Sequence, residues 1–134
     1  MLYMLDTNIV IYMMNNEVQN LTRRLSKMKK GEAVMSVVTY AEIRAGIEIR
    51  STNREADEWV LDKVTQLLPV IPFDTHAAKV YGQMRSFVRD RKRNALDRLI
   101  GAHALCYGAT LVTHNPADFA DYPNLMIEDW VVQH

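Results

Sequence analysis

The sequence has little of several features that would direct its function. The only cysteine, Cys106, excludes an intramolecular disulfide and a zinc site built from several thiolates. Sixteen Lys+Arg balance sixteen Asp+Glu, so the total charge favours neither a nucleic acid nor a membrane surface as partner. No apolar run approaches the roughly 18 residues of a membrane-spanning helix. With no basic leader segment at the N-terminus, a cytoplasmic protein is expected.

The pattern of apolar residues predicts one domain over residues 1–134, because no repeat or low-complexity tract divides the chain. Short apolar runs predict strands at residues 2–5, 33–37, 68–71, 110–113 and 125–127. Helical spacing predicts helices at residues 8–14, 18–28, 39–49, 55–67, 75–89 and 95–107. This alternation indicates an α/β fold in three layers, with helices on both faces of a mainly parallel sheet of about five strands.

Acidic residues lie at the ends of predicted strands or at the beginnings of predicted helices. Asp6 follows the first strand, Glu42 lies one turn past the second, Asp97 is near the start of the last helix, and Asp118 lies in a turn after the fourth strand. If the sheet is parallel, its carboxyl edge brings all four together. Their repulsion would need a hard cation such as Mg²⁺ or Mn²⁺, which activates water for phosphodiester hydrolysis.

Each acid also has a purely structural interpretation. Asp6 can be a helix N-cap, Thr39-x-x-Glu42 matches a capping box, Asp97 is favourable to a helix dipole, and Asp118 alone fits a surface position. A non-catalytic module that acts through a protein partner therefore stays open as an alternative. A haloacid-dehalogenase-like phosphatase is disfavoured, because the second aspartate that it needs is missing.

Four segments of the chain share a family pattern. They are Tyr3-Met-Leu-Asp6-Thr7-Asn8, Ser36-x-x-Thr39-x-Ala41-Glu42-Ile-x-x-Gly46, Asp97-x-x-Ile100-x-Ala102-His103-Ala104 and Thr113-x-Asn115-x-x-x-Phe119. In this order and at this spacing, the set resembles the PIN-domain ribonucleases and, within them, the VapC toxins of bacterial toxin–antitoxin pairs. The resemblance implies a PIN-domain fold and a Mg²⁺- or Mn²⁺-dependent endoribonuclease.

The resemblance also implies roles for individual residues. Asp6, Glu42 and Asp97 would hold the metal and act in catalysis, and Asp118 is our candidate for a fourth acid in the same role. The supporting residues of the pocket would be Thr7, Asn8, Thr113 and Asn115. Cleavage should leave a 5′-phosphate and a 3′-hydroxyl, with structured RNA such as a tRNA anticodon loop as an expected substrate.

The resemblance further implies a small VapB-type antitoxin as partner and a homodimer. By these predictions the protein inhibits translation as a toxin. A PIN nuclease outside toxin–antitoxin systems is the alternative enzyme.

The basic residues before and around Asp97 depart from the family pattern. Many relatives have a Gly-Arg-Pro-like segment there, whereas residues 89–94 of this chain read Arg-Asp-Arg-Lys-Arg-Asn. We expect these residues to form a phosphate-binding surface. The net charge of zero therefore hides a separation of basic and acidic residues along the chain. The RNA-binding candidates are Arg85, Arg89, Arg91, Lys92, Arg93 and Arg98. In the same region, His103 and Cys106 are expected in the core.

Overall fold

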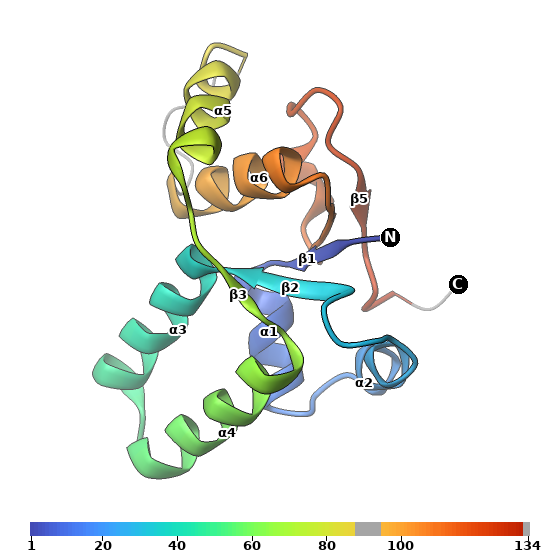
Figure 1. Ribbon diagram of the computed structural model, residues 1–134. Helices are drawn as coiled ribbons and strands as arrows, with labels where there is room; N and C mark the ends of the chain where they lie inside the picture. Colours follow the sequence, from blue (N-terminus) through green and yellow to red (C-terminus); the bar gives the residue numbers. More distant parts are fainter. Residues whose placement is uncertain (88–94, 133–134) are drawn as a thin grey trace.

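The computed structural model describes residues 1–87 and 95–132 and contains a central sheet with helices on both sides (Figure 1). The strands are β1 (Tyr3–Leu5), β2 (Ala33–Ser36), β3 (Val70–Ile71), β4 (Thr110–Val112) and β5 (Ile127–Glu128). The helices are α1 (Thr7–Met14), α2 (Gln19–Ser26), α3 (Val37–Arg50), α4 (Arg54–Leu67), α5 (Thr75–Arg85) and α6 (Ala95–Tyr107), and a 3₁₀ turn, η1, spans Pro116–Phe119. The predicted three-layer α/β fold is confirmed.

The strand order β3-β2-β1-β4-β5 determines where a site can form. All paired strands are parallel, and Tyr3 of β1 is in register with Ala33 of β2 on one side and Thr110 of β4 on the other. Strands β2 and β3 follow β1 on one side of it, and the chain then crosses to the other side of β1, where β4 and β5 lie. Ligands of such sheets bind outside the carboxyl ends of the strands where the order reverses, which here is between β1 and β4.

Alternating residues of the strands divide the core into two. Leu5 and Met35 face the cluster that contains the buried residues of α1, α3 and α4. Met4 and Leu111, whose side chains point to the opposite face, pack in a second cluster with Ile100 of α6. Figure 1 shows the same division, with α1, α3 and α4 on one side of the sheet and α5 and α6 on the other. No helix in the described residues is both long and apolar enough to cross a membrane.

The beginning of α3 differs from the prediction. The helix begins at Val37 rather than at residue 39, because the hydroxyl oxygen of Ser36 accepts a 3.0 Å hydrogen bond from the backbone N–H of Val38. Thr39 is therefore a buried residue of the first turn and not a cap. The capping-box interpretation of Glu42 is wrong, since a cap must precede the helix.

The edge strands are shorter than predicted or displaced. Leu68 caps the end of α4, and Pro69 cannot donate to a neighbouring strand, so β3 is confined to Val70–Ile71. The last strand lies at Ile127–Glu128 instead of residues 125–127. Helix α5 ends at Arg85, and the last two residues of the predicted helix over 75–89 lie outside the described residues.

His103 is a core residue, as predicted, with 2% of its surface exposed. Its Nδ1 lies 2.7 Å from the Ser36 hydroxyl. His103 also donates a ring N–H to the backbone of Pro72, so a neutral imidazole can satisfy both contacts, with Nδ1 accepting from the Ser36 hydroxyl. Burial lowers the pKa of His103 in agreement with this state. The expectation for Cys106 is wrong, because its side chain is only half-buried.

Candidate active site

Asp6 stands directly after β1, at the carboxyl edge of the sheet. Its backbone N–H donates to the Val112 carbonyl of β4 over 3.0 Å, which continues the pairing of these strands. One carboxylate oxygen accepts a 3.0 Å hydrogen bond from the N–H of Ile9 and caps α1. The Thr113 hydroxyl, at the end of β4, donates to the same carboxylate. Asp6 is thus an N-cap, and the remaining acceptor capacity of its carboxylate is free for other partners.

Glu42 lies in the second turn of α3 and is held by the beginning of α1. The hydroxyl of Thr7, the residue after Asp6, donates a 2.7 Å hydrogen bond to Oε1 of Glu42. The Thr39 hydroxyl oxygen lies 3.2 Å from the same Thr7 oxygen. The carboxylate of Glu42 therefore points toward the junction of β1 and α1.

Asp97 and Asp118 approach from the other layer. Asp97 is half-buried in the first turn of α6. Asp118 lies in η1, where its backbone N–H donates to the Asn115 carbonyl over 3.0 Å. The N–H of Asn115 in turn donates to the Thr113 side-chain oxygen over 3.1 Å, so the turn is attached to the end of β4.

These elements enclose one cavity of about 100 Å³. Its lining residues are Asp6, Thr7, Asn8, Glu42, Asp97, Asn115, Asp118 and Phe119. The structure therefore brings together all the predicted acids and most of the predicted supporting residues. Thr113 is fully buried and supports Asp6 rather than lining the cavity. The catalytic and metal-binding roles of these residues stay predictions.

Like charges gather in the cavity, and the charge of Arg98 only partly offsets their effect on Asp97. Burial, together with the charges of the other acids, raises the pKa of Asp97 to about 6. Burial also raises the pKa of Asp6, against the hydrogen bonds from Thr113 and Ile9 that lower it. Among the described residues, no Lys or Arg lines the cavity. The folded chain therefore disfavours full ionisation of its own acids, as at a site that attracts a cation.

The chemistry of the donor set fits a hard divalent cation. The cavity presents carboxylate, amide and hydroxyl oxygens, and the described part of its lining contains no histidine or cysteine, which disfavours zinc. Within residues 1–87 and 95–132, no three His, Cys, Asp or Glu side chains form a compact metal-binding group. The acids surround the cavity as separate donors and not as a closed cage.

The basic residues predicted to contact RNA have different outcomes. Arg89, Arg91, Lys92 and Arg93 lie outside the described residues. Arg85 is partly exposed in the last turn of α5, so an RNA contact there stays a prediction. The prediction for Arg98 is wrong: its side chain is 2% exposed and forms a 2.7 Å ion pair with Asp121. Helical spacing turns it toward η1 and away from solvent.

Two residues near the site had no predicted role. Phe119 lines the cavity, and Ser36 caps the helix that contains Glu42 while bonding to His103 of α6. The position of Ser36 between a strand and a helix is the signal that could have identified it as a cap.

The chain is similar to a known family and to named proteins over almost its whole length. A family model described as the PIN domain matches residues 3–125. The chain is 32% identical to Ribonuclease VapC2 of Rickettsia felis over 133 residues, 97% of this chain and 98% of the relative. It is 31% identical to tRNA(fMet)-specific endonuclease VapC of Shigella flexneri over 130 residues, 96% of this chain and 97% of the relative.

Solved structures show the same arrangement of elements. DNA-bound VapBC from Salmonella typhimurium matches with a TM-score of 0.88 and 31% identity, covering 97% of this chain and 99% of the other. VapBC-1 from nontypeable Haemophilus influenzae matches with a TM-score of 0.86 and 32% identity, covering 98% of this chain and all of the other. The similarity thus extends over nearly the whole chain.

Proposed function

The chain belongs to the PIN-domain family and, within it, to the VapC ribonucleases, and we propose that it is a Mg²⁺- or Mn²⁺-dependent endoribonuclease toxin of a toxin–antitoxin pair. Residues 1–134 form one PIN domain, which acts in the cytoplasm and inhibits translation by cleaving RNA. The observation that carries this proposal is the cavity between β1 and β4, where Asp6, Glu42 and Asp97 meet and where no described Lys or Arg is among the lining residues.

The acids have distinct roles in this proposal. Asp6, Glu42 and Asp97 bind the metal, and Asp118, which lines the same cavity, completes the set. Divalent-metal dependence is general in PIN-domain ribonucleases, and Mg²⁺ or Mn²⁺ is the ion that an all-oxygen donor set favours. When bound, such an ion stabilises charge on the phosphate and makes a nucleophile of water at neutral pH.

The surrounding polar groups orient the acids and the substrate. Thr7 holds Oε1 of Glu42, and Thr113 holds Asp6, so neither carboxylate rotates freely. The side-chain amides of Asn8 and Asn115 line the cavity and can donate hydrogen bonds to phosphate oxygens. Hydrolysis then leaves a 5′-phosphate and a 3′-hydroxyl.

The proposed substrate is an unpaired loop of a structured RNA, such as a tRNA anticodon loop. Sequence-specific recognition of RNA generally needs splayed, unstacked bases. The similar Shigella flexneri protein is named a tRNA(fMet)-specific endonuclease, which supports this class of substrate. Arg85 and the basic residues 89–93 are the proposed phosphate contacts.

The proposed partner is a VapB-type antitoxin, since the similar structures are VapBC complexes. An apolar groove of about 410 Å³ offers a surface for it, between α1, α2 and the end of α4. Leu25 and the exposed Leu67 are among its walls. Leu67→Asp is expected to abolish copurification with a coexpressed VapB-type antitoxin and to leave RNA cleavage intact. Sedimentation of the free protein tests the proposed homodimer.

The central experiment compares wild type with Asp6→Asn and Asp97→Asn. Purified proteins are incubated with total tRNA in Mg²⁺, in Mn²⁺ and in EDTA. We expect cleavage only by wild type and only with a divalent ion, with a 5′-phosphate on the new ends. Equal cleavage by all three proteins, or cleavage that persists in EDTA, would overturn the proposed function.

A further inference from the structure

A buried arginine joins the two elements of the cavity that come from the second layer. Arg98 of α6 donates to both carboxylate oxygens of Asp121, with its two terminal nitrogens at 2.7 and 3.2 Å. The Arg98 side chain is 2% exposed, whereas that of Asp121 is 38% exposed. Such two-point pairing of a planar guanidinium with a carboxylate fixes orientation as well as distance.

Tyr122 strengthens the same connection. Its hydroxyl donates a 2.6 Å hydrogen bond to the backbone carbonyl of Arg98, and its ring centroid lies 5.2 Å from the guanidinium carbon. The missing side chain of Gly101 makes the close packing possible, since a Cβ there would lie 2.7 Å from Tyr122 and 3.0 Å from Phe119. The first turns of α6 thus bind residues 119–122 through an ion pair, a hydrogen bond and ring contacts.

Both ends of this connection are next to acids of the cavity. Arg98 directly follows Asp97 in α6, and Asp121 lies one turn of chain beyond Asp118. The turn that holds Asp118 is only the four-residue η1, and the backbone–backbone hydrogen bonds described for it join residues 115–122 to one another. Its place against α6 therefore depends on side-chain contacts.

We propose that Arg98 is a positioning residue that acts through Asp121 and Tyr122 to hold Asp118 at the cavity that Asp97 also lines. This inference rests on the proposed function, because it assigns Arg98 to the geometry of the metal-binding acids. Stability alone is a weak explanation for the pair, since burying the guanidinium costs desolvation free energy that an ion pair with the 38% exposed Asp121 side chain repays only in part. The two-point geometry is what an apolar pair cannot supply.

The test uses three variants of the full chain. Arg98→Met keeps the volume of the side chain and removes the charge and the two-point contact. Asp121→Asn leaves the buried guanidinium without its carboxylate, so it should lower the melting temperature most. The double variant removes both charges and is expected to regain most of the melting temperature of wild type.

The decisive measurements are kcat and KM for RNA cleavage and the affinity for Mn²⁺ by calorimetry. Loss of a residue that orients metal ligands typically lowers metal affinity or activity by about 10–100-fold. We expect that loss in kcat and in Mn²⁺ affinity for Arg98→Met and for the double variant, with KM nearly unchanged. Arg54→Met is the matched control: Arg54 also pairs with carboxylates, but on α4, and its loss should alter neither quantity.

The outcomes separate positioning from stability and from the proposed function. A double variant that regains wild-type kcat and Mn²⁺ affinity along with its melting temperature overturns the positioning role. If wild type binds Mn²⁺ but cleaves no RNA, and the variants bind Mn²⁺ more weakly, the positioning role is supported and the proposed function is overturned. Wild type that binds no Mn²⁺ overturns both.

Discussion

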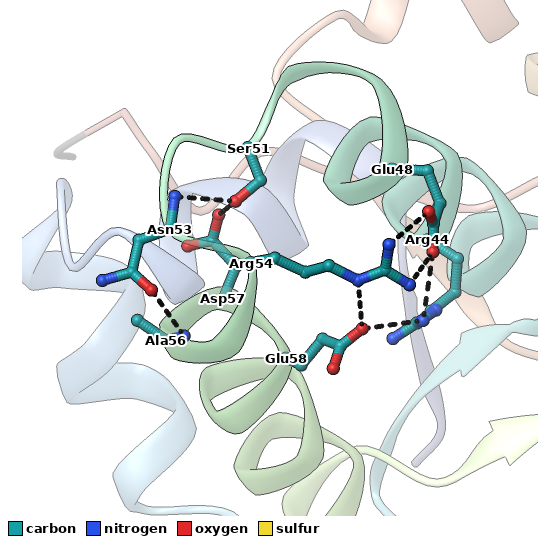
Figure 2. Close-up of polar contacts among 8 residues, drawn as sticks. All are labelled: Arg44, Glu48, Ser51, Asn53, Arg54, Ala56, Asp57 and Glu58. Carbon is teal, nitrogen blue, oxygen red and sulfur yellow. Dashed lines mark hydrogen bonds and ion pairs between the residues drawn. The ribbon is translucent and has the colours of Figure 1, made fainter.

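The two ends of α3 hold carboxylates in opposite electrostatic surroundings. Near the beginning of the helix, Glu42 faces a cavity lined by other acids and, among the described residues, by no Lys or Arg. Near its end, Glu48 pairs with Arg54 of α4 and with Arg44 of its own helix (Figure 2). Arg44 and Arg54 also contact Glu58, so each charge in this hairpin network has a partner of opposite sign.

Acids on the elements beside the two ends of α3 have pKa values shifted in opposite directions. Burial and neighbouring acids raise the pKa of Asp97 to about 6, whereas hydrogen bonds from Arg54 and Arg44 lower the pKa of Glu58. The fold thus disfavours charge in the cavity and favours it in the hairpin network. Like charges held together indicate a site that needs a cation, and paired charges indicate scaffold.

Local hydrogen bonds at the α3–α4 hairpin support the interpretation as scaffold. The Asn53 side chain accepts a 3.1 Å hydrogen bond from the N–H of Ala56 and caps α4, and the Ser51 hydroxyl donates to Asp57 (Figure 2). Exposed ion pairs contribute little stability each, because water screens them and their long side chains lose entropy.

Removing one of the like charges should give the largest effect and should separate activity from stability. Asp97→Asn is expected to lower kcat/KM for RNA cleavage by at least about 100-fold, as loss of a metal ligand does. In EDTA at pH 7.5 the same variant should raise the free energy of unfolding by about 1–2 kcal/mol, because the folded state no longer holds a disfavoured charge and solvent screens part of the effect at this half-buried position. Cleavage kinetics and urea unfolding measure the two quantities.

Glu58→Gln is the matched control in the hairpin network. Because the fold favours the charge of Glu58, its neutralisation should leave cleavage unchanged and should not stabilise the protein. If Asp97→Asn lowers the free energy of unfolding instead, the interpretation of the cavity as a set of mutually repelling charges is wrong.

A divalent cation that offsets the negative charge of the cavity should stabilise the folded protein. Mn²⁺ at about 100 times its Kd is expected to add about 2.7 kcal/mol to the free energy of unfolding, by mass action on the folded state. The melting temperature of wild type should therefore rise with Mn²⁺ and return with EDTA. Asp6→Asn should show almost no rise, and an equal rise in both proteins would place the ion elsewhere.

Acidification should change the contributions of the cavity and of the hairpin network to the free energy of unfolding in opposite directions. As the pH falls below about 6, a proton competes for Asp97, so Mn²⁺ affinity should fall up to about tenfold per pH unit. Without metal, the folded state binds more protons than the unfolded state between the unfolded value of 3.8 and about 6, so the destabilisation from Asp97 is relieved as the pH falls. The contribution of Glu58, whose pKa is lowered from its usual 4.5, is lost instead as the pH falls from about 4.5 through that lowered pKa. Calorimetry between pH 7 and 4 and unfolding between pH 7 and the acid limit of the fold measure the two effects, with Asp97→Asn and Glu58→Gln as references.

Arg54→Met should give the smallest effect. It removes ion pairs with Glu48 and Glu58, all of them on the surface. The melting temperature should fall by no more than a few degrees at low salt, and the difference should nearly vanish near 1 M salt, where the Debye length is about 3 Å. A large drop in melting temperature that persists at high salt would contradict the interpretation of the hairpin network as weak surface ion pairs.

Much of the fold followed from local sequence patterns. Every predicted strand and helix exists, because apolar periodicity and flanking breakers act over a few residues. Errors arose where two local signals competed. At α3, the Thr39 and Glu42 pair imitated a capping box, but Ser36 lay closer to the end of β2 and capped the helix first.

The cavity was predictable in composition, whereas its supporting contacts were not. Asp6, Glu42, Asp97 and Asp118 could be assigned to strand ends and helix starts from the chain alone. The hydrogen bond from Thr7 to Glu42 joins residues 35 positions apart, and that between Ser36 and His103 joins residues 67 apart. No local pattern specifies such pairs.

The sequence by itself determined the alternation of strands and helices and the supply of acids at one edge of the sheet, since both depend on spacing along single elements. The tertiary structure decided that β4 lies beside β1, which turns separate acids into one cavity. It also decided that Arg98 is a buried partner of Asp121 and not part of a basic surface. The physical reason is that a side chain's burial and charge partner depend on the element packed against it, and in this chain that element comes from a distant segment.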